Sequence, residues 1–214
     1  MDAALRELNG RLDLATQRLL DDARTLNESD LRAPSLLPGW TRGYVVAHLA
    51  RGADAMRTLL AGARSGQRGP GPADARAVRT ATERAAALNP ADLMADLADS
   101  AMALRAVAGR LPDEAWQVMI RVPDVAPFPA AEVLTRRLTE VELHHCDLGT
   151  GYGPADWPAA FAGMELAEPM RTQRKDRLTY PGPATETEPG SPGRPAAPWK
   201  PGQPLPGSWI GRSG

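Results

Sequence analysis

Residues 129–147, PAAEVLTRRLTEVELHHCD, decide how this chain is expected to fold. Plotted at about 100° per residue, the stretch has one apolar stripe, and LGTGYGP directly after it predicts the end of a helix. The stripe consists of Leu134, Leu138, Val141, His145 and Leu148, and its flank consists of Val133, Arg137, Glu140 and His144. We therefore expect a helix that buries His145 most deeply and carries Glu140 and His144 at the edge of its buried face.

The same helix offers candidate metal ligands. Glu140 and His144 are four residues apart, so their side chains project side by side and could hold one ion. Glu142 and His145, three residues apart, form a rival pair. An ordinary surface pair without an ion is the competing interpretation, and the helical pattern alone does not decide among the three.

A third histidine lies far from this helix in the sequence. His48, in YVVAHLARGADAM, shares a helical face with Val45, Leu49, Gly52 and Met56, and a histidine on such a face is often a plain core residue. Helix bundles, however, build metal sites where inward faces of different helices meet. One histidine from this segment and a Glu/His pair from the other would supply three ligands and leave a position open, as catalytic zinc sites do.

Three further segments also predict helices. Leucines and alanines recur every three or four residues over about 2–26, a second helix is expected from the cap Thr41 to about Ala63, and a third from Pro90, after the cap Asn89, to about Leu111. A weaker helix starts near Ala73, and MIRVPDVAPF is expected to be a short strand or an extended crossover. The chain is therefore predicted to be mainly α, an up-and-down four-helix bundle.

Composition limits the function classes. A net charge of −1 gives no electrostatic case for binding nucleic acid or an anionic membrane, and no segment approaches the roughly 20 apolar residues of a membrane span. One cysteine in 214 residues excludes an internal disulfide framework and fits a reducing compartment. We expect a soluble, cytoplasmic protein; the oligomeric state does not follow from the sequence.

The C-terminal part differs in composition. Residues 170–214 contain nine Pro and seven Gly, and such a segment buries too little apolar surface to offset its ordering entropy. We expect one helical domain over residues 1–165 and a Pro/Gly-rich, disordered tail over 166–214.

Three other features have simple interpretations. Cys146 lies away from Glu140 and His144 on the wheel, so it is expected to be a small buried filler rather than a nucleophile. Trp40 is expected to anchor a helix start. GTGYGP has neither a preceding strand nor a following lysine, so it predicts a helix stop and not a phosphate loop.

Three motifs together resemble the mycothiol-dependent maleylpyruvate isomerase family, within the DinB-like metal-binding bundles. They are LPGWTRGYVVAHLAR, LADSAMALRAVAGRLPDEAW and RLTEVELHHCDLGTGY, and the resemblance covers roughly residues 5–165. It implies a divalent metal, usually zinc, held by His48, Glu140 and His144, and so favours this pair over Glu142 and His145. Nickel, iron and manganese remain alternatives to zinc.

The resemblance also implies a chemistry. Mycothiol, a low-molecular-weight thiol cosubstrate, would add to the double bond of a small-molecule substrate, maleylpyruvate, allow rotation, and leave to give the trans isomer. The family usually has a small α/β domain after the bundle, with a basic residue that helps build the active site. Here WIGR near the C-terminus makes Arg212 the candidate for that residue, and residues from about 170 are interpreted as a degraded or frame-shifted remnant. Loss of isomerase activity with a surviving metal site would follow from that interpretation.

Other functions share these features. A mycothiol S-transferase that detoxifies electrophiles would need the same thiol and metal. A non-catalytic metal-binding bundle would need the metal but not the thiol, and a helical scaffold without an ion would need neither. Thiol-dependent turnover and metal content separate these alternatives.

Overall fold

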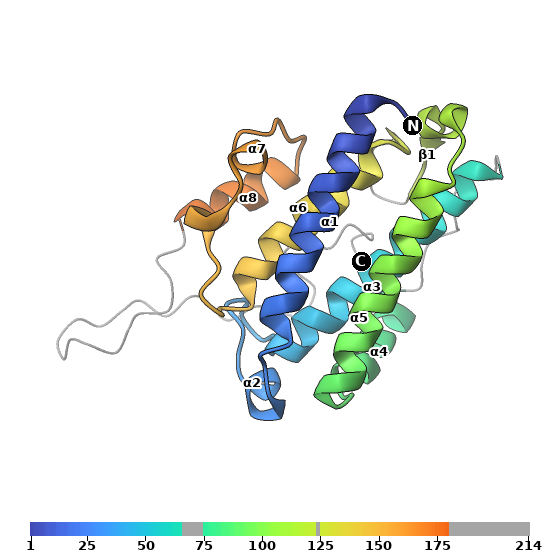
Figure 1. Cartoon of the computed structure of the whole chain (residues 1–214). Helices are drawn as coiled ribbons and strands as arrows, with labels where there is room; N and C mark the ends of the chain where they lie inside the picture. Colours follow the sequence, from blue (N-terminus) through green and yellow to red (C-terminus); the bar gives the residue numbers. More distant parts are fainter. Residues whose placement is uncertain (66–74, 123–124, 180–214) are drawn as a thin grey trace.

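The computed structural model describes residues 1–65, 75–122 and 125–179, and most of them are helical (Figure 1). Four long helices form the body: α1 (Ala3–Ala23), α3 (Arg42–Arg64), α5 (Pro90–Gly109) and α6 (Glu132–Asp147). Shorter elements are α2 (Glu28–Arg32), α4 (Ala75–Ala86), α7 (Ala159–Ala162), α8 (Met170–Thr179), and 3-10 turns at Asp113–Gln117 and Pro154–Asp156.

The long helices close into a ring. α1 packs on α6, α6 on α3, α3 on α5, and α5 on α1. One contiguous apolar core runs between them, with Leu19, Leu49, Leu97 and Leu134 essentially inaccessible to solvent. The predicted four-helix bundle is confirmed.

The helix starts follow the predicted capping chemistry. The Thr41 hydroxyl accepts a hydrogen bond from the backbone N–H of Tyr44 at 3.1 Å, and the Asn89 side chain accepts one from Asp92 at 3.0 Å. Pro90 occupies the first turn of α5, where its missing N–H costs nothing. The α3 cap matters most for the site, because α3 carries His48.

A two-stranded antiparallel hairpin fills the connection between α5 and α6. β1 (Met119–Ile120) pairs with β2 (Phe128–Pro129), with Ile120 opposite Phe128. Of the two expected forms, a short strand or an extended crossover, the structure therefore has short strands. Both Ile120 and Phe128 are buried, so the hairpin closes one end of the core.

α6 is buried around nearly its whole circumference, and here the wheel interpretation was wrong. Glu140 is 4% exposed and His144 is fully buried, although the wheel placed both at an edge. The reason is that α1, α3 and α8 all pack on α6. A helical wheel marks only the apolar face of α6 as buried, so it does not reveal the faces that neighbouring helices cover through charged contacts.

Helix α8 lies within the segment that composition predicted to have low order. Met170 is buried, Arg174 donates to the carbonyl of Phe161 at 2.7 Å, and Arg177 donates to Asp147, so one apolar side chain and two arginines dock this helix. The remainder of the predicted tail, residues 180–214, falls outside the described residues, as does Arg212.

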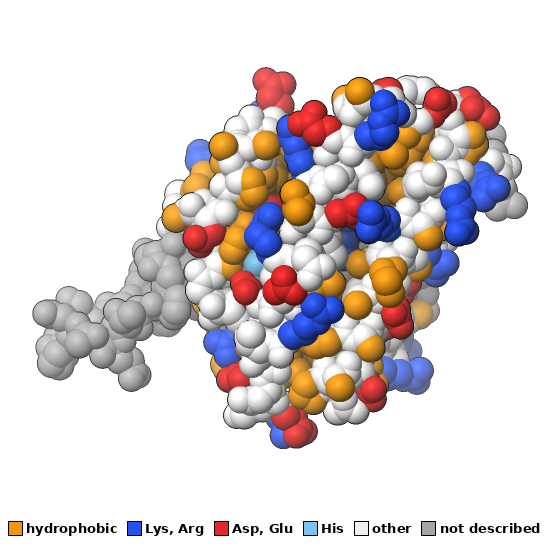
Figure 2. Space-filling view, viewed as in Figure 1, with side chains coloured by type: hydrophobic (Ala, Val, Ile, Leu, Met, Phe, Trp, Pro, Cys, Tyr) orange, Lys and Arg blue, Asp and Glu red, His pale blue; other side chains and the backbone are white. Residues whose placement is uncertain are grey.

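The surface fits the near-neutral charge. The face in Figure 2 shows acidic and basic side chains interspersed rather than gathered by sign. Among the described residues, no helix combines the length and the apolar character needed to cross a membrane.

Candidate metal centre

Three side chains from two helices converge inside the bundle. His48 comes from α3, and Glu140 and His144 come from α6. One ligand atom of each lies within 4.8 Å of the other two, with His48 Nε2 3.5 Å from Glu140 Oε1. The two imidazole rings meet edge to face, with centroids 4.9 Å apart.

Glu140 is held from both sides. Arg137 Nη1 donates to Glu140 Oε2 and to the backbone carbonyl of Leu49, each at 2.8 Å, which leaves Oε1 facing His48. On the α3 side, Gly52 leaves room for the carboxylate: a Cβ there would lie 2.5 Å from Oε1. Helices α3 and α6 can therefore approach closely only because residue 52 has no side chain.

His144 is oriented by a chain of two charged residues. Its Nδ1 lies 2.9 Å from Asp147 Oδ2, and Arg177 of α8 donates to both Asp147 oxygens, at 3.2 and 2.7 Å. Burial would raise the pKa of Asp147, but His144 and Arg177 outweigh it and hold that pKa below its usual value. An ionised carboxylate can only accept, so Nδ1 donates, and a singly protonated ring then has its lone pair on Nε2.

His48 is kept neutral by its surroundings. Burial, with His144 and Arg137 nearby, lowers the pKa of His48 well below its usual value. Trp40 lies beside both imidazoles, its ring centroid 5.1 Å from that of His48 and 6.3 Å from that of His144. Neutral His48 therefore has a lone pair available to a ligand, and it lies next to the aromatic ring of Trp40.

The donor set fits a divalent cation. Among the described residues, the buried Nε2 atoms of His48 and His144 have no hydrogen-bond partner, which is costly unless something else satisfies them. In a tetrahedral zinc site with arms of about 2.1 Å, neighbouring ligand atoms lie ~3.4 Å apart, close to the observed His48–Glu140 separation. Two imidazoles and one carboxylate are ligands that zinc accepts.

Comparison with known proteins identifies the family of this chain. Residues 12–149 match the family model described as the mycothiol maleylpyruvate isomerase N-terminal domain. The chain belongs to this family. Among curated proteins, none matches this chain closely enough to count as a relative.

Two solved structures resemble the helical bundle of this chain. A crystal structure of the mycothiol-dependent maleylpyruvate isomerase has a TM-score of 0.69 at 27% identity, and a histidine-to-alanine mutant of that enzyme has 0.69 at 26%. Each comparison covers 73% of this chain and 65% of the other chain, so this chain spans just under two thirds of the length of the proteins it matches.

The rival pair points away from His48. Glu142 binds Arg18 of α1 at 2.7 Å, and His145 Nε2 lies 2.7 Å from Asp22, also on α1. Tyr152, from the loop after α6, stacks on His145 with ring centroids 3.8 Å apart and hydrogen-bonds Glu142. This second cluster ties α6 to α1 and shares no ligand with the candidate centre.

Cys146 is a buried filler, as expected. It is 4% exposed, and burial raises the pKa of its thiol to about 12. A thiol so seldom ionised is a poor nucleophile.

Sequence reasoning missed several residues that support the site. Gly52 was noted only as a member of a face, and Arg137 only as a neighbour of Glu140. Asp147 and Arg177 were not singled out, although Asp147 is three residues after His144, the spacing of a helical neighbour. Trp40 was taken as a packing anchor, yet it also borders the two histidines. Arg177 gave no signal, since nothing in its local sequence indicates which buried acid it meets.

Proposed function

We propose that this chain is a divalent-metal, mycothiol-dependent enzyme of the maleylpyruvate isomerase type. The observation that carries the proposal is the pair of buried, unpartnered Nε2 atoms of His48 and His144, which converge on the Glu140 carboxylate within the described structure. Membership of the mycothiol-dependent family supports the choice of thiol.

His48, Glu140 and His144 would hold the ion, and zinc suits this set best. When bound, a divalent cation lowers the pKa of a coordinating thiol and can polarise substrate oxygens. Three protein ligands leave a coordination position for a small molecule.

The remaining side chains prepare this position. Arg137 holds one oxygen of Glu140 and turns the other toward His48. Asp147 and Arg177 fix the ring of His144, and the ring of Trp40 packs beside both imidazoles. Preorganised ligands of this kind avoid reorganisation during the reaction.

The proposed reaction conserves atoms and electrons. The mycothiol sulfur forms a bond to one carbon of the cis double bond of maleylpyruvate, and the electron pair moves into the conjugated carbonyl system. The former double bond, now single, rotates. The electron pair of the carbonyl system would then return to re-form the double bond and expel the sulfur with its bonding pair, so that the trans isomer and mycothiol are released.

The test is isomerisation of maleylpyruvate by the purified full-length chain, with and without mycothiol. We expect turnover that needs mycothiol, stops after metal removal, returns on adding zinc, and is absent in His48→Ala. Conjugation of mycothiol to an electrophile without isomerisation would instead identify a thiol transferase. Metal binding with neither activity would reduce the protein to a non-catalytic metal-binding bundle, and the proposal would be wrong.

A further inference from the structure

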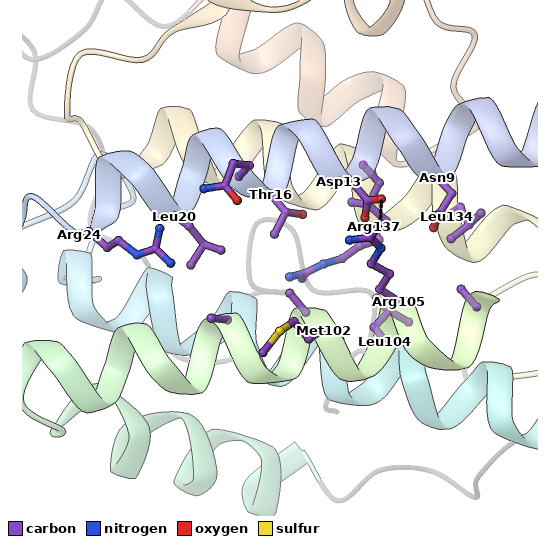
Figure 3. A pocket seen from close by; sticks show the side chains of 15 residues that line it. Asn9, Asp13, Thr16, Leu20, Arg24, Met102, Leu104, Arg105, Leu134 and Arg137 are labelled. Atoms are coloured by element: carbon purple, nitrogen blue, oxygen red, sulfur yellow. Dashed lines mark ion pairs between the residues drawn. The ribbon is translucent and has the colours of Figure 1, made fainter. Parts of the chain in front are cut away.

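A cavity lies between α1 and α5. Its volume is about 280 Å³, and side chains of α1, α5 and α6 line it (Figure 3). His48, Glu140 and His144 are not among the lining residues, so this cavity is distinct from the candidate metal centre. It opens because α5 presents small side chains, Ala98, Ala101 and Ala108, toward α1.

Arg137 reaches into this cavity from α6, as Figure 3 shows. Its side chain is 1% exposed and is fixed in place through Nη1, which binds the carbonyl of Leu49 and the carboxylate of Glu140. Its other terminal nitrogen, Nη2, is buried and has no hydrogen-bond partner among the described residues. A buried charged donor without an acceptor is costly, and an anionic oxygen is the partner that relieves the cost best.

No lining acid competes for this nitrogen. Asp13 is the acidic side chain among the lining residues, and it already pairs with Arg105 at 3.2 Å. Glu140, the anionic partner of Arg137, does not line the cavity, so the cavity meets the cation and not the carboxylate. The hydroxyl of Thr16, also on the wall, adds a donor for a second oxygen.

The rest of the wall is partly polar, through Asn9, Gln17 and Arg24 of the α1 side, and partly apolar. Leucines from three helices line it beside the alanines: Leu12, Leu20, Leu104 and Leu134. The volume falls just under the roughly 300–1,000 Å³ typical of drug-sized ligands, so the cavity suits a smaller molecule. We infer that it binds a short-chain aliphatic carboxylate, with the carboxylate on Arg137 and the hydrocarbon chain along the leucines and alanines. This inference does not rest on the proposed function.

The probe is butyrate, and butyramide is its neutral counterpart of nearly equal shape. Backbone amide signals of ¹⁵N-labelled full-length protein are followed by NMR, after metal removal and dialysis of the chelator, at constant ionic strength. We expect saturable shifts at Thr16 and Ala101 with butyrate and at least tenfold weaker binding of butyramide. Removing the metal ensures that binding to an ion at Glu140 does not produce the signal.

Ala101→Leu fills the cavity without touching Arg137, and we expect it to weaken butyrate binding at least tenfold. Ala98→Leu is a second filling variant in case the first fails to fold. Ala61→Leu adds the same volume at an exposed position of α3 and should leave binding unchanged. Shifts that do not saturate, equal binding of butyramide, or unchanged binding in a folded filling variant would overturn the inference, whatever the metal centre does.

Discussion

At the residue scale, the closest fit in the candidate centre is between Gly52 and Glu140. Because a Cβ at position 52 would lie 2.5 Å from Oε1, Gly52→Ala must displace the carboxylate or push α3 from α6. We expect the variant to lose metal affinity by at least tenfold, measured by titration with zinc against a competing chelator.

Gly10→Ala is the matched control for this substitution. Gly10 lies within α1 with nothing near its would-be Cβ, so alanine there should leave metal affinity unchanged and, with its better helix propensity, stabilise the fold by up to about 1 kcal/mol. Equal metal affinity in Gly52→Ala and wild type would show that Glu140 does not depend on this close approach.

Cys146 permits a prediction about reactivity. With a pKa of about 12, only about one thiol in ten thousand is ionised at pH 8, and the side chain is buried. We expect an aromatic disulfide reagent to modify the native protein at least a hundredfold more slowly than the protein in denaturant. Rapid modification of native protein would mean that Cys146 is accessible and could act as a nucleophile.

At this scale, the sequence predicted the candidate metal ligands but not the residues that hold them in place. His48, Glu140 and His144 were chosen because the resemblance preferred one i, i+4 pair, whereas the helical pattern left Glu142 and His145 open. The supports are tertiary contacts: Gly52 touches a residue 88 positions away in sequence, and Arg177 meets Asp147 only because α8 docks on α6. A pattern within one helix carries no information about such partners.

At the scale of elements, α8 is the least expected part of the described structure. Arg177 is 10% exposed and donates to both oxygens of Asp147, so α8 acts on His144 through one carboxylate. We expect Arg177→Gln to lower zinc affinity by about tenfold, the lower end of the effect reported for residues that orient metal ligands. Arg171 lies on the same helix, and Arg171→Gln, which removes only an exposed pair with Glu168, should leave zinc affinity unchanged.

The two arginine variants separate orientation from simple helix docking. If both lower zinc affinity equally, α8 contributes only by covering α6. If neither does, Asp147 orients His144 without help from α8, and the role given to Arg177 is wrong.

The helices themselves were largely predictable. Thr41, Asn89 and Pro90 mark starts by local hydrogen bonding, and Gly149, with a φ of +65°, marks the stop after α6. The helix α8 was missed because its segment is rich in charge and poor in aliphatics. Its docking through Arg174 and Arg177 uses buried polar contacts, which composition cannot distinguish from a solvated tail.

At the scale of the whole molecule, buried histidines link stability to pH. Burial, the largest cause in each case, lowers the pKa of His48 and of His145, against an opposing effect of Asp22 at His145. Below an unfolded pKa of about 6.5, these two histidines therefore bind more protons in the unfolded chain than in the folded chain. Stability of the metal-free protein should fall as pH drops from 7.5 to 5.5.

Urea unfolding at these two pH values measures the effect. His48→Asn removes one of the two groups, so its free energy of unfolding should change less with pH than that of the wild type. An equal or larger change in the variant would mean that His48 is not kept neutral by the fold.

The bundle as a whole brings α3 and α6 together so that one ion could join residues about 90 positions apart. The most direct measurement is metal content per chain by elemental analysis, for wild type, Glu140→Gln and Glu142→Gln. Glu142 is an equally buried glutamate on the same helix that faces α1, so it is the matched control. We expect close to one zinc per chain in wild type and Glu142→Gln, and background levels in Glu140→Gln. Wild-type protein that holds no ion after equilibration with zinc, or Glu140→Gln that still holds one, would contradict the assignment of the centre to His48, Glu140 and His144.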